Sequence, residues 1–120
     1  MKLVVNMIMG SMMNAFSEGM SLAEAGGLKT EDLLDCLDNG ALANPMFKLK
    51  GPNMAKGNYP TAFPLKHQQK DMRLAVALGD SLGVSMPVAA AANESFKRAR
   101  GQGKGDDDFS AVHAVLRQGN

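Results

Sequence analysis

Residues 3–25 constrain the fold more than any other segment, because apolar side chains recur there at helical spacing around most of a circumference. Two stripes run along this segment. One consists of Leu3, Met7, Gly10 with Ser11, Asn14, Glu18 and Leu22, and the other of Val5, Ile8, Met12, Ala15, Gly19 and Leu22. We expect a single long helix at the centre of the molecule, buried on several sides.

The start of this helix has no capping residue. A helix in a globular protein usually opens after Ser, Thr, Asp or Asn, whereas only Met1 and Lys2 precede this apolar run. We therefore expect the chain to have been cut inside a longer protein.

Turn-forming residues divide the next part of the chain. The Gly-Gly pair at 26–27 is expected to end the long helix. Thr30 is expected to cap a second helix that stops near residues 39–40. Asn44 and Pro45 predict the start of a short third helix, which the Gly-Pro pair at 51–52 should close before a loop to residue 64.

Three further helices are expected. The fourth spans residues 65–82, and the fifth runs from Pro87 to about residue 100. The glycine-rich stretch 101–105 predicts a flexible connection, and the aspartates at 106–108 should cap a last helix that ends at Leu116. Because no run of alternating β-branched residues is present, the prediction is all-α: one domain, residues 1–120, forming a six-helix bundle around the long first helix.

The composition of the 120-residue chain is that of an ordinary globular domain, with 45% hydrophobic and 21% charged residues. Its net charge of +1 gives no electrostatic reason to expect binding to nucleic acid or to an anionic membrane. The only cysteine, Cys36, excludes an internal disulfide and is interpreted as a structural thiol. The 10 methionines are expected in the core or at a subunit interface.

Two polar groups call for a functional or a structural explanation. Lys2 and Asn6 are spaced i, i+4 on one face of the first helix. They form either a frayed helix end with Lys2 in solvent, or an ammonium that donates a proton while an amide orients it. The polar cluster at residues 66–71 is either a solvated first turn or a site where Asp71, next to Lys70, anchors a ligand.

Two other kinds of site are rejected. His67 and His113 have no carboxylate or thiol at metal-ligand spacing, so no metal site is predicted. Residues 101–105 follow a helix rather than a strand and do not have the spacing of a dinucleotide-binding turn, so they are not interpreted as a phosphate loop.

Ordered segments covering nearly the whole chain resemble the β-hydroxyacid dehydrogenases of the 3-hydroxyisobutyrate dehydrogenase type. The sequences of these segments most resemble those of the plant and algal glyoxylate/succinic semialdehyde reductases. The matching segments are residues 2–10, 15–19, 44–48, 63–75 and 86–94. The resemblance implies the helical C-terminal domain of such an enzyme, a fold like the C-terminal domain of 6-phosphogluconate dehydrogenase.

The resemblance also implies a reaction. NADPH or NADH reduces a small aldehyde or 2-oxo acid, or the reverse reaction oxidises a 3-hydroxy acid. By motif match, Lys2 is the general acid that protonates the carbonyl oxygen, and Asn6 holds the substrate or the lysine. Phe63 and Asp71 match positions near the substrate and Lys2, and Lys70 matches the lysine that reaches the cofactor.

A Rossmann domain precedes this helical half in the family and carries the glycine-rich turn for the pyrophosphate. No such turn occurs in these 120 residues. We therefore expect the cofactor to be bound mainly by that missing domain, and the chain alone to be inactive. The resemblance further implies a homo-oligomer, dimer or tetramer, in the cytoplasm, with the plastid and the mitochondrion as alternatives. No membrane and no nucleic acid are expected as partners.

A second hypothesis is a non-catalytic oligomerisation or assembly module. A nuclear, chromatin-associated branch related to this family also resembles the sequence, but that branch lacks the catalytic lysine. Lys2, in the matching frame, favours the enzyme.

Overall fold

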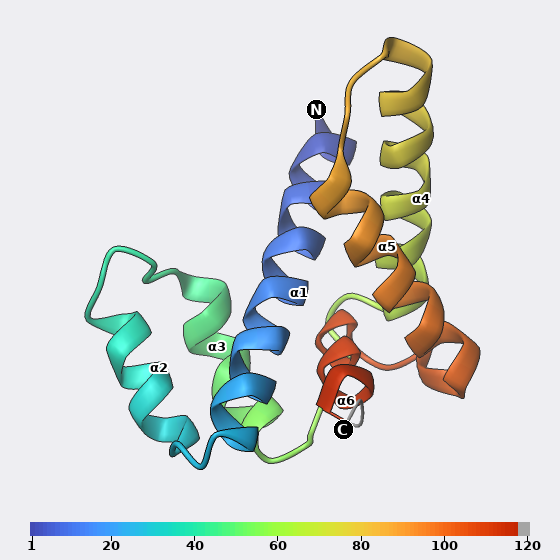
Figure 1. Ribbon diagram of the computed structural model, residues 1–120. Helices are drawn as coiled ribbons and strands as arrows, with labels where there is room; N and C mark the ends of the chain where they lie inside the picture. The colour runs from blue at the N-terminus through green and yellow to red at the C-terminus, as the bar shows by residue number, and fades with distance from the viewer. Residues whose placement is uncertain (118–120) are drawn as a thin grey trace.

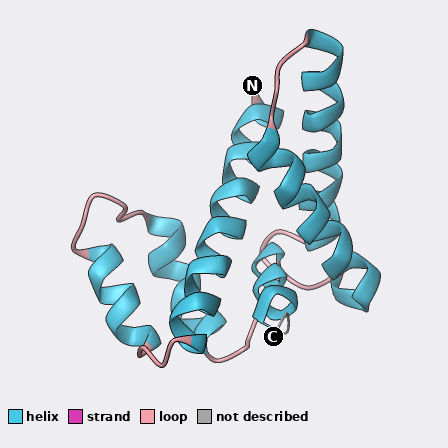
Figure 2. Cartoon of the chain, in the orientation of Figure 1, coloured by secondary structure: helices cyan, strands magenta, loops and turns pink. Residues whose placement is uncertain are grey.

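The long helix α1 (Lys2–Ala25) is the axis around which the chain is arranged. Figure 1 shows α2 (Thr30–Asp38) and α3 (Pro45–Ala55) as a hairpin on one side of α1, with α4 (Leu65–Leu82) and α5 (Pro87–Ala99) on the other. This computed structural model describes residues 1–117, and every regular element within them is helical (Figure 2). The expected all-α bundle is confirmed.

The C-terminal part of the chain returns to α1 through short helical turns. A π-helical turn, η1 (Arg100–Lys104), extends α5, and a 3-10 turn, η2 (Phe109–Ala111), leads directly into α6 (Val112–Arg117). Asp108 caps η2 as expected, because its side chain accepts a hydrogen bond from the Ser110 N–H at 3.1 Å. The connection expected to be flexible at 101–105 is a kinked helical turn, with non-helical backbone at Gln102 and at Gly103, where φ is +84.

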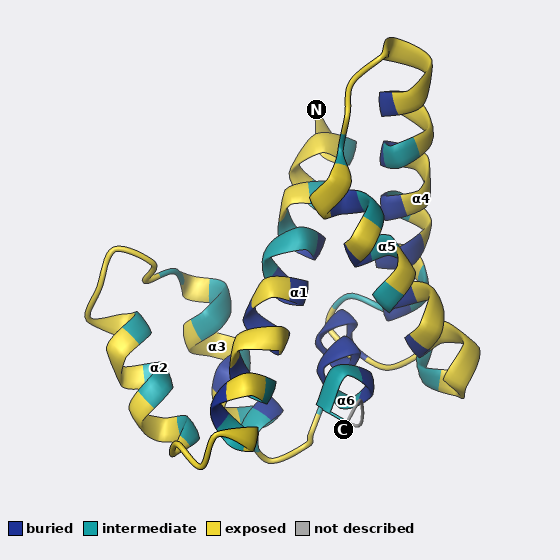
Figure 3. Cartoon of the chain, in the orientation of Figure 1, coloured by how far each residue is buried: buried dark blue, intermediate teal, exposed yellow. Residues whose placement is uncertain are grey.

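The core lies between α1, α4, α5 and the C-terminal segment, where the buried residues in Figure 3 face one another. Its largest fully buried apolar side chains are Met13, Met20, Met54, Leu65, Met72, Phe96, Phe109, Val112 and Val115. Four of these are methionines, so the expected use of methionine in the core is confirmed.

The expectation that α1 is buried on several sides is wrong for one face. Met13, Ser17 and Met20 are fully buried, whereas Val5 is 53% exposed and Leu22 is 76% exposed. Figure 3 shows exposed turns along the length of α1. The neighbouring helices pack against the rest of the α1 circumference and leave this apolar face uncovered.

Helix α3 also differs from expectation at its end. It begins as predicted, with the Asn44 side chain accepting a hydrogen bond from the Phe47 N–H at 3.0 Å. It does not stop at the Gly-Pro pair, but continues through Pro52 to Ala55. Met54 in this last turn is fully buried, so tertiary packing outweighs the helix-breaking tendency of the proline. Gly51 lets the two helices approach there, because an added Cβ would lie 2.7 Å from a methyl group of Leu34, which would have to move.

Thr30 does not cap α2 as expected. It is the first residue inside the helix, and Lys29 occupies the cap position without a side-chain hydrogen bond. Glu31 and Asp32 lie in the first turn of α2, where their negative charges interact favourably with the positive end of the helix.

The start of α4 is fixed by the buried carboxylate of Asp108. One oxygen accepts hydrogen bonds from the backbone N–H groups of Ala62 and Phe63, each at 3.0 Å. The other oxygen lies 2.9 Å from Lys50 Nζ on α3. The same carboxylate therefore joins α3, the loop before α4 and the start of η2.

Candidate active site

The antiparallel pair α1 and α4 brings together two polar segments that are far apart in sequence (Figure 1). Asn6, in the second turn of α1, donates a hydrogen bond from Nδ2 to Asp71 Oδ2 on α4 at 2.9 Å. Both side chains are half-buried. Two of the residues singled out in the sequence therefore meet, at a separation of 65 positions.

Gln68 supports this contact from the buried side. Its amide nitrogen donates to the backbone carbonyl of Asn6 at 2.9 Å and lies 3.3 Å from Met72 Sδ. Gln68 is fully buried, and its Oε1 has no hydrogen-bond partner among the described residues. The neighbouring glycine of α1 makes room for it, since a Cβ on Gly10 would lie 2.4 Å from Gln68 Nε2.

Gln68 and Gln69 show that the 66–71 cluster is not wholly a solvated first turn, which was one of the two alternatives, although His67 and Lys70 are exposed. The two glutamines are buried, and Gln69 links α4 to the next helix by donating to Asn93 Oδ1 at 3.0 Å. Arg100 Nη1 donates to Gln69 Oε1 at 2.8 Å. Helical periodicity carried a signal for Gln68, because it precedes the core residues Met72, Ala75 and Gly79 at i, i+4, i+7 and i+11.

Lys2 lies in the first turn of α1, one turn before Asn6 and on the same side of the helix. Its side chain is exposed, and within residues 1–117 it makes neither a hydrogen bond nor an ion pair. Lys2 therefore has an accessible ammonium on the side of α1 that carries Asn6, and it is not bonded to Asp71.

The remaining two candidates occupy different positions on or near α4. Phe63, just before the helix, is half-buried, and its ring packs edge-on against Phe109 with centroids 5.9 Å apart. Lys70 is exposed, and no partner for its ammonium occurs in the described part of the chain. The structure therefore joins Asn6 with Asp71, and gives neither Phe63 nor Lys70 a direct bond to that pair.

A second polar network, which the sequence did not reveal, lies near the other end of α1. His113 on α6 is fully buried, its Nδ1 shares a hydrogen bond with the Tyr59 hydroxyl at 2.9 Å, and its Nε2 lies 3.5 Å from Glu24 Oε1. Arg117 binds the other oxygen of Glu24 at 2.9 Å. Burial lowers the pKa of His113 against the opposing effect of Glu24, and burial raises the pKa of Tyr59.

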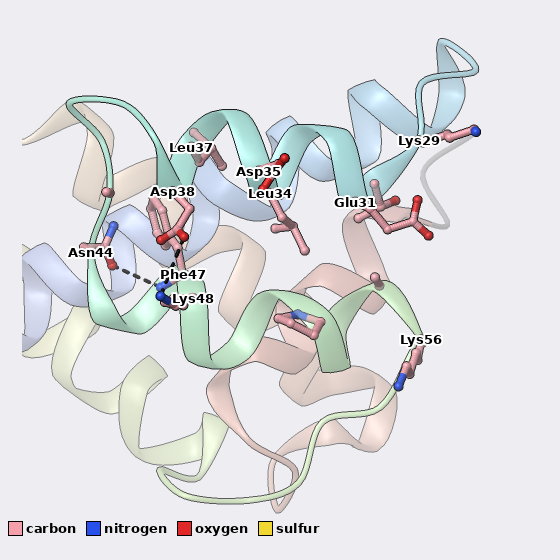
Figure 4. A pocket seen from close by; sticks show the side chains of 14 residues that line it. Lys29, Glu31, Leu34, Asp35, Leu37, Asp38, Asn44, Phe47, Lys48 and Lys56 are labelled. Atoms are coloured by element: carbon pink, nitrogen blue, oxygen red, sulfur yellow. Dashed lines mark hydrogen bonds and ion pairs between the residues drawn. The ribbon is translucent and has the colours of Figure 1, made fainter.

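A hollow of about 670 Å³ between α2 and α3 is a weaker candidate for chemistry (Figure 4). Its floor includes the apolar side chains of Leu34, Leu37 and Phe47, and an exposed ion pair, Lys48 with Asp38 at 3.7 Å, crosses its rim. The hollow is not lined by any of the residues expected to contact substrate or cofactor, which are Lys2, Asn6, Phe63, Lys70 and Asp71. Cys36, on the same α2, is exposed rather than packed in the core.

The described residues contain neither a metal-binding cluster nor a membrane-spanning helix. Residues 1–117 contain no group of three or more histidine, cysteine, aspartate or glutamate side chains placed to hold a metal ion. Within the same residues, no helix combines the length and the apolar character needed to cross a membrane.

Known proteins resemble the chain over nearly its whole length. A protein family described as NAD-binding of NADP-dependent 3-hydroxyisobutyrate dehydrogenase matches residues 1–116. The chain is 73% identical over 112 residues to glyoxylate/succinic semialdehyde reductase 1 of Arabidopsis thaliana, which covers 93% of this chain and 39% of that protein. It is 57% identical over 117 residues to the chloroplastic reductase 2 of the same plant, covering 98% of this chain and 33% of that protein.

The fold is also found in solved structures. The crystal structure of a 3-hydroxyisobutyrate dehydrogenase from Salmonella typhimurium matches with a TM-score of 0.88 and 25% sequence identity, over 95% of this chain and 40% of the other. The chain thus spans well under half the length of these relatives, but the family match covers nearly all of the chain. It therefore belongs to the 3-hydroxyisobutyrate dehydrogenase family, in the part of the family protein that is described as NAD-binding.

Proposed function

We propose that this chain is the substrate-side helical domain of an NAD(P)H-dependent oxidoreductase that reduces small aldehydes and 2-oxo acids such as glyoxylate and succinic semialdehyde. The observation that carries the proposal is the 2.9 Å hydrogen bond from Asn6 to Asp71. It joins two of the five segments that carry the family resemblance, residues 2–10 and 63–75, and Lys2 precedes Asn6 by one turn on the same side of α1. The names of the two plant relatives support the substrate class.

In this proposal Lys2 is the general acid. A carbonyl oxygen gains negative charge as its carbon is reduced, and a nearby ammonium stabilises that charge and then transfers a proton to the oxygen. Lys2 suits the task because no carboxylate in the described structure is bonded to it, so its protons are free for a substrate oxygen. The Asn6 amide lies one helical turn away, where it can orient either the substrate or the lysine.

Asp71 acts on Asn6 in this scheme. Its carboxylate accepts from Asn6 Nδ2, which leaves the Asn6 Oδ1 atom directed away from Asp71 and able to accept a hydrogen bond. The buried Gln68 amide holds the Asn6 backbone at the same level. The amide of Asn6 is therefore fixed at both its backbone and its side chain.

The nicotinamide cofactor supplies the hydride when bound. Lys70 fits a role toward an anionic cofactor, because its ammonium is exposed and no acidic side chain of the described structure neutralises it. We propose that Lys70 contacts the cofactor and that Phe63 contributes an apolar wall near the substrate. We further propose that the cofactor is bound mainly by a Rossmann domain outside these 120 residues.

The test joins this chain to the cofactor-binding domain of a full-length relative and measures NADPH oxidation with glyoxylate and with succinic semialdehyde. Lys2→Ala should lower turnover by about 10²–10⁴-fold, the contribution of a positioned general acid. Lys56→Ala is the matched control, because Lys56 is an exposed lysine at the C-terminal end of α3 and is not one of the candidate site residues. This variant should leave turnover unchanged.

Two outcomes would reject the proposal in different ways. If Lys2→Ala retains turnover within a fewfold of the parent, the assigned role of Lys2 is wrong. If the joined protein folds and binds NADPH but reduces neither substrate, the non-catalytic assembly module becomes the better hypothesis.

The cellular location is proposed separately. We propose the cytoplasm, with the plastid as the alternative that the chloroplastic relative supports. Fluorescence localisation of the full-length gene product distinguishes the two.

A further inference from the structure

His67 lies between two residues that are proposed to act near the substrate, and it has no role in the proposed reaction. His67 and Asp71 are four residues apart in α4, so their side chains lie on the same face of the helix, one turn apart. On its other side, the His67 ring packs against the ring of Phe63, with centroids 6.4 Å apart and planes inclined by 36°. Because Asp71 is bonded to Asn6, His67 is about one helical turn from that contact.

The imidazole of His67 is available to a ligand. His67 is exposed, and within residues 1–117 neither of its ring nitrogens makes a hydrogen bond or an ion pair. Asp106 interacts electrostatically with His67, but the Asp106 carboxylate is bonded to Lys66 at 2.8 Å. An imidazole has an N–H donor in its neutral form and two when protonated. His67 can therefore donate a hydrogen bond to an anionic group.

The position of His67 around α4 distinguishes it from the neighbouring lysines. Three basic side chains lie in the first turns of this helix, at Lys66, His67 and Lys70. At 100° per residue, His67 is turned about 40° from Asp71 around the helix axis, whereas Lys70 and Lys66 are turned about 100° and 140°. Of the three, His67 thus lies closest to the face that meets Asn6.

We propose that His67 binds the carboxylate at the far end of an aldehyde substrate, and so selects short aldehydes with a terminal carboxylate, such as succinic semialdehyde. The inference rests on the proposed function, in which Lys2 and Asn6 act on the carbonyl end. Succinic semialdehyde carries its carboxylate two methylene groups further from the aldehyde carbon than glyoxylate does, which adds about 2.5 Å. The longer substrate can therefore extend toward His67, one turn or about 5.4 Å along α4, whereas the glyoxylate carboxylate stays beside the reacting carbon.

Phe63 suits the middle of the same substrate. Its ring is half-buried, with one side packed edge-on against Phe109 and another in contact with His67. Methylene groups that link an aldehyde to a carboxylate gain from contact with such an apolar surface. Phe63 and His67 together therefore match a chain with an apolar middle and an anionic end.

Equilibrium binding tests the assignment without turnover. The protein is this chain joined to the cofactor-binding domain of a relative, with NADPH present so that an alcohol cannot react. The probes are the two reduced products, 4-hydroxybutyrate and glycolate. His67→Leu removes the N–H donor and should raise the dissociation constant of 4-hydroxybutyrate by about tenfold or more, the loss expected for a hydrogen bond to a charged group. Glycolate binding should be unchanged, and isothermal titration calorimetry measures both.

Two further variants separate a binding role from a structural one. His67→Gln keeps an N–H donor and should retain most of the 4-hydroxybutyrate binding. Arg73→Leu removes an exposed cation that is turned about 120° from His67 around α4, and it should change neither dissociation constant. Circular dichroism of the three variants should match that of the parent.

Steady-state kinetics gives a second readout. His67→Leu should raise KM for succinic semialdehyde and leave kcat nearly unchanged, because His67 acts on the end of the substrate that is remote from the reacting carbon. The same variant should leave KM unchanged for the methyl ester of succinic semialdehyde, which has no negative charge at that end.

Failure of this inference and failure of the proposed function give different results. If 4-hydroxybutyrate binds through His67 but neither aldehyde is reduced, only the proposed reaction is wrong. If His67→Leu binds both products as the parent does, or if the parent does not bind 4-hydroxybutyrate, His67 is not the carboxylate site. Equal weakening of both products would also overturn the inference, because it would indicate a structural role for His67.

Discussion

At the scale of single residues, Asp108 shows how one buried carboxylate can organise a helical domain. Burial raises the pKa of its carboxyl, but hydrogen bonds from Lys50, from the backbone at Phe63 and Ala62 and from Ser110 together lower it below its ordinary value. A carboxyl whose pKa is lower in the folded than in the unfolded chain stabilises the fold at pH values above the unfolded pKa. Its contribution is lost as the pH falls through the folded pKa.

This arrangement predicts a large effect of Asp108→Asn. The variant leaves the ammonium of Lys50 mostly buried and without its carboxylate, since the Lys50 side chain is only 15% exposed. We expect the free energy of unfolding at pH 7 to fall by about 3 kcal/mol, measured by urea titration. The parent should also lose stability below pH ~4, and the variant should lack that part of the loss.

The matched control is Asp106→Asn. Asp106 bonds Lys66 at 2.8 Å, but its side chain is 90% exposed, so the substitution should change stability little. Equal stability of the two variants would show that the Asp108 network does not hold the start of α4.

At the scale of secondary-structure elements, two glycines of α1 should respond in opposite directions to the same substitution. A Cβ at Gly10 would lie 2.4 Å from Gln68 Nε2 and 2.7 Å from Met72 Sδ, and both neighbours are fully buried, so that each would have to shift within the core. Gly10→Ala should therefore lower stability by about 1–3 kcal/mol, in spite of the higher helix propensity of alanine.

Gly19→Ala is the control within the same helix. No atom lies within 4 Å of the added methyl group, so helix propensity alone acts and should stabilise the monomer by about 0.5–1 kcal/mol. Urea titrations at protein concentrations low enough to keep the chain monomeric measure both values. A stabilising Gly10→Ala would mean that α1 and α4 are not in close contact at this level.

The helices could be predicted from the sequence because their signals are local. Gly26–Gly27, Asn44–Pro45 and Gly83 punctuate the chain where the structure also ends or begins a helix. One exception is the end of α3, where the burial of Met54 outweighs the helix-breaking tendency of Pro52. The sequence pattern shows the proline, but it does not show that Met54, in the helical turn after the proline, packs into a core formed by residues distant in sequence.

The candidate site could be predicted only in part, because some of its contacts depend on how two helices pack together. Family resemblance pointed to Asn6 and Asp71, and the structure joins them by a hydrogen bond. It could not point to Gln68, whose role depends on the gap that Gly10 leaves between two helices. One face of α1 was predicted to be buried although it is exposed, because apolar periodicity does not distinguish a buried face from an exposed one.

At the scale of the whole molecule, the buried network around His113 links α1, the loop before α4 and α6, and it predicts how stability depends on pH. Burial lowers the pKa of His113, so between its folded pKa and about 6.5 the unfolded chain binds more protons than the folded one. Stability should therefore decrease as the pH falls below about 6.5, with a slope of up to about 1.4 kcal/mol per pH unit from this group.

His113→Gln should remove that slope, whatever its effect on stability at pH 8. His67→Gln is the control, because His67 is the chain's other histidine and is exposed, and this variant should retain the slope. Thermal unfolding from pH 5 to pH 8 measures all three proteins, and an unchanged slope in His113→Gln would assign the pH dependence to other groups.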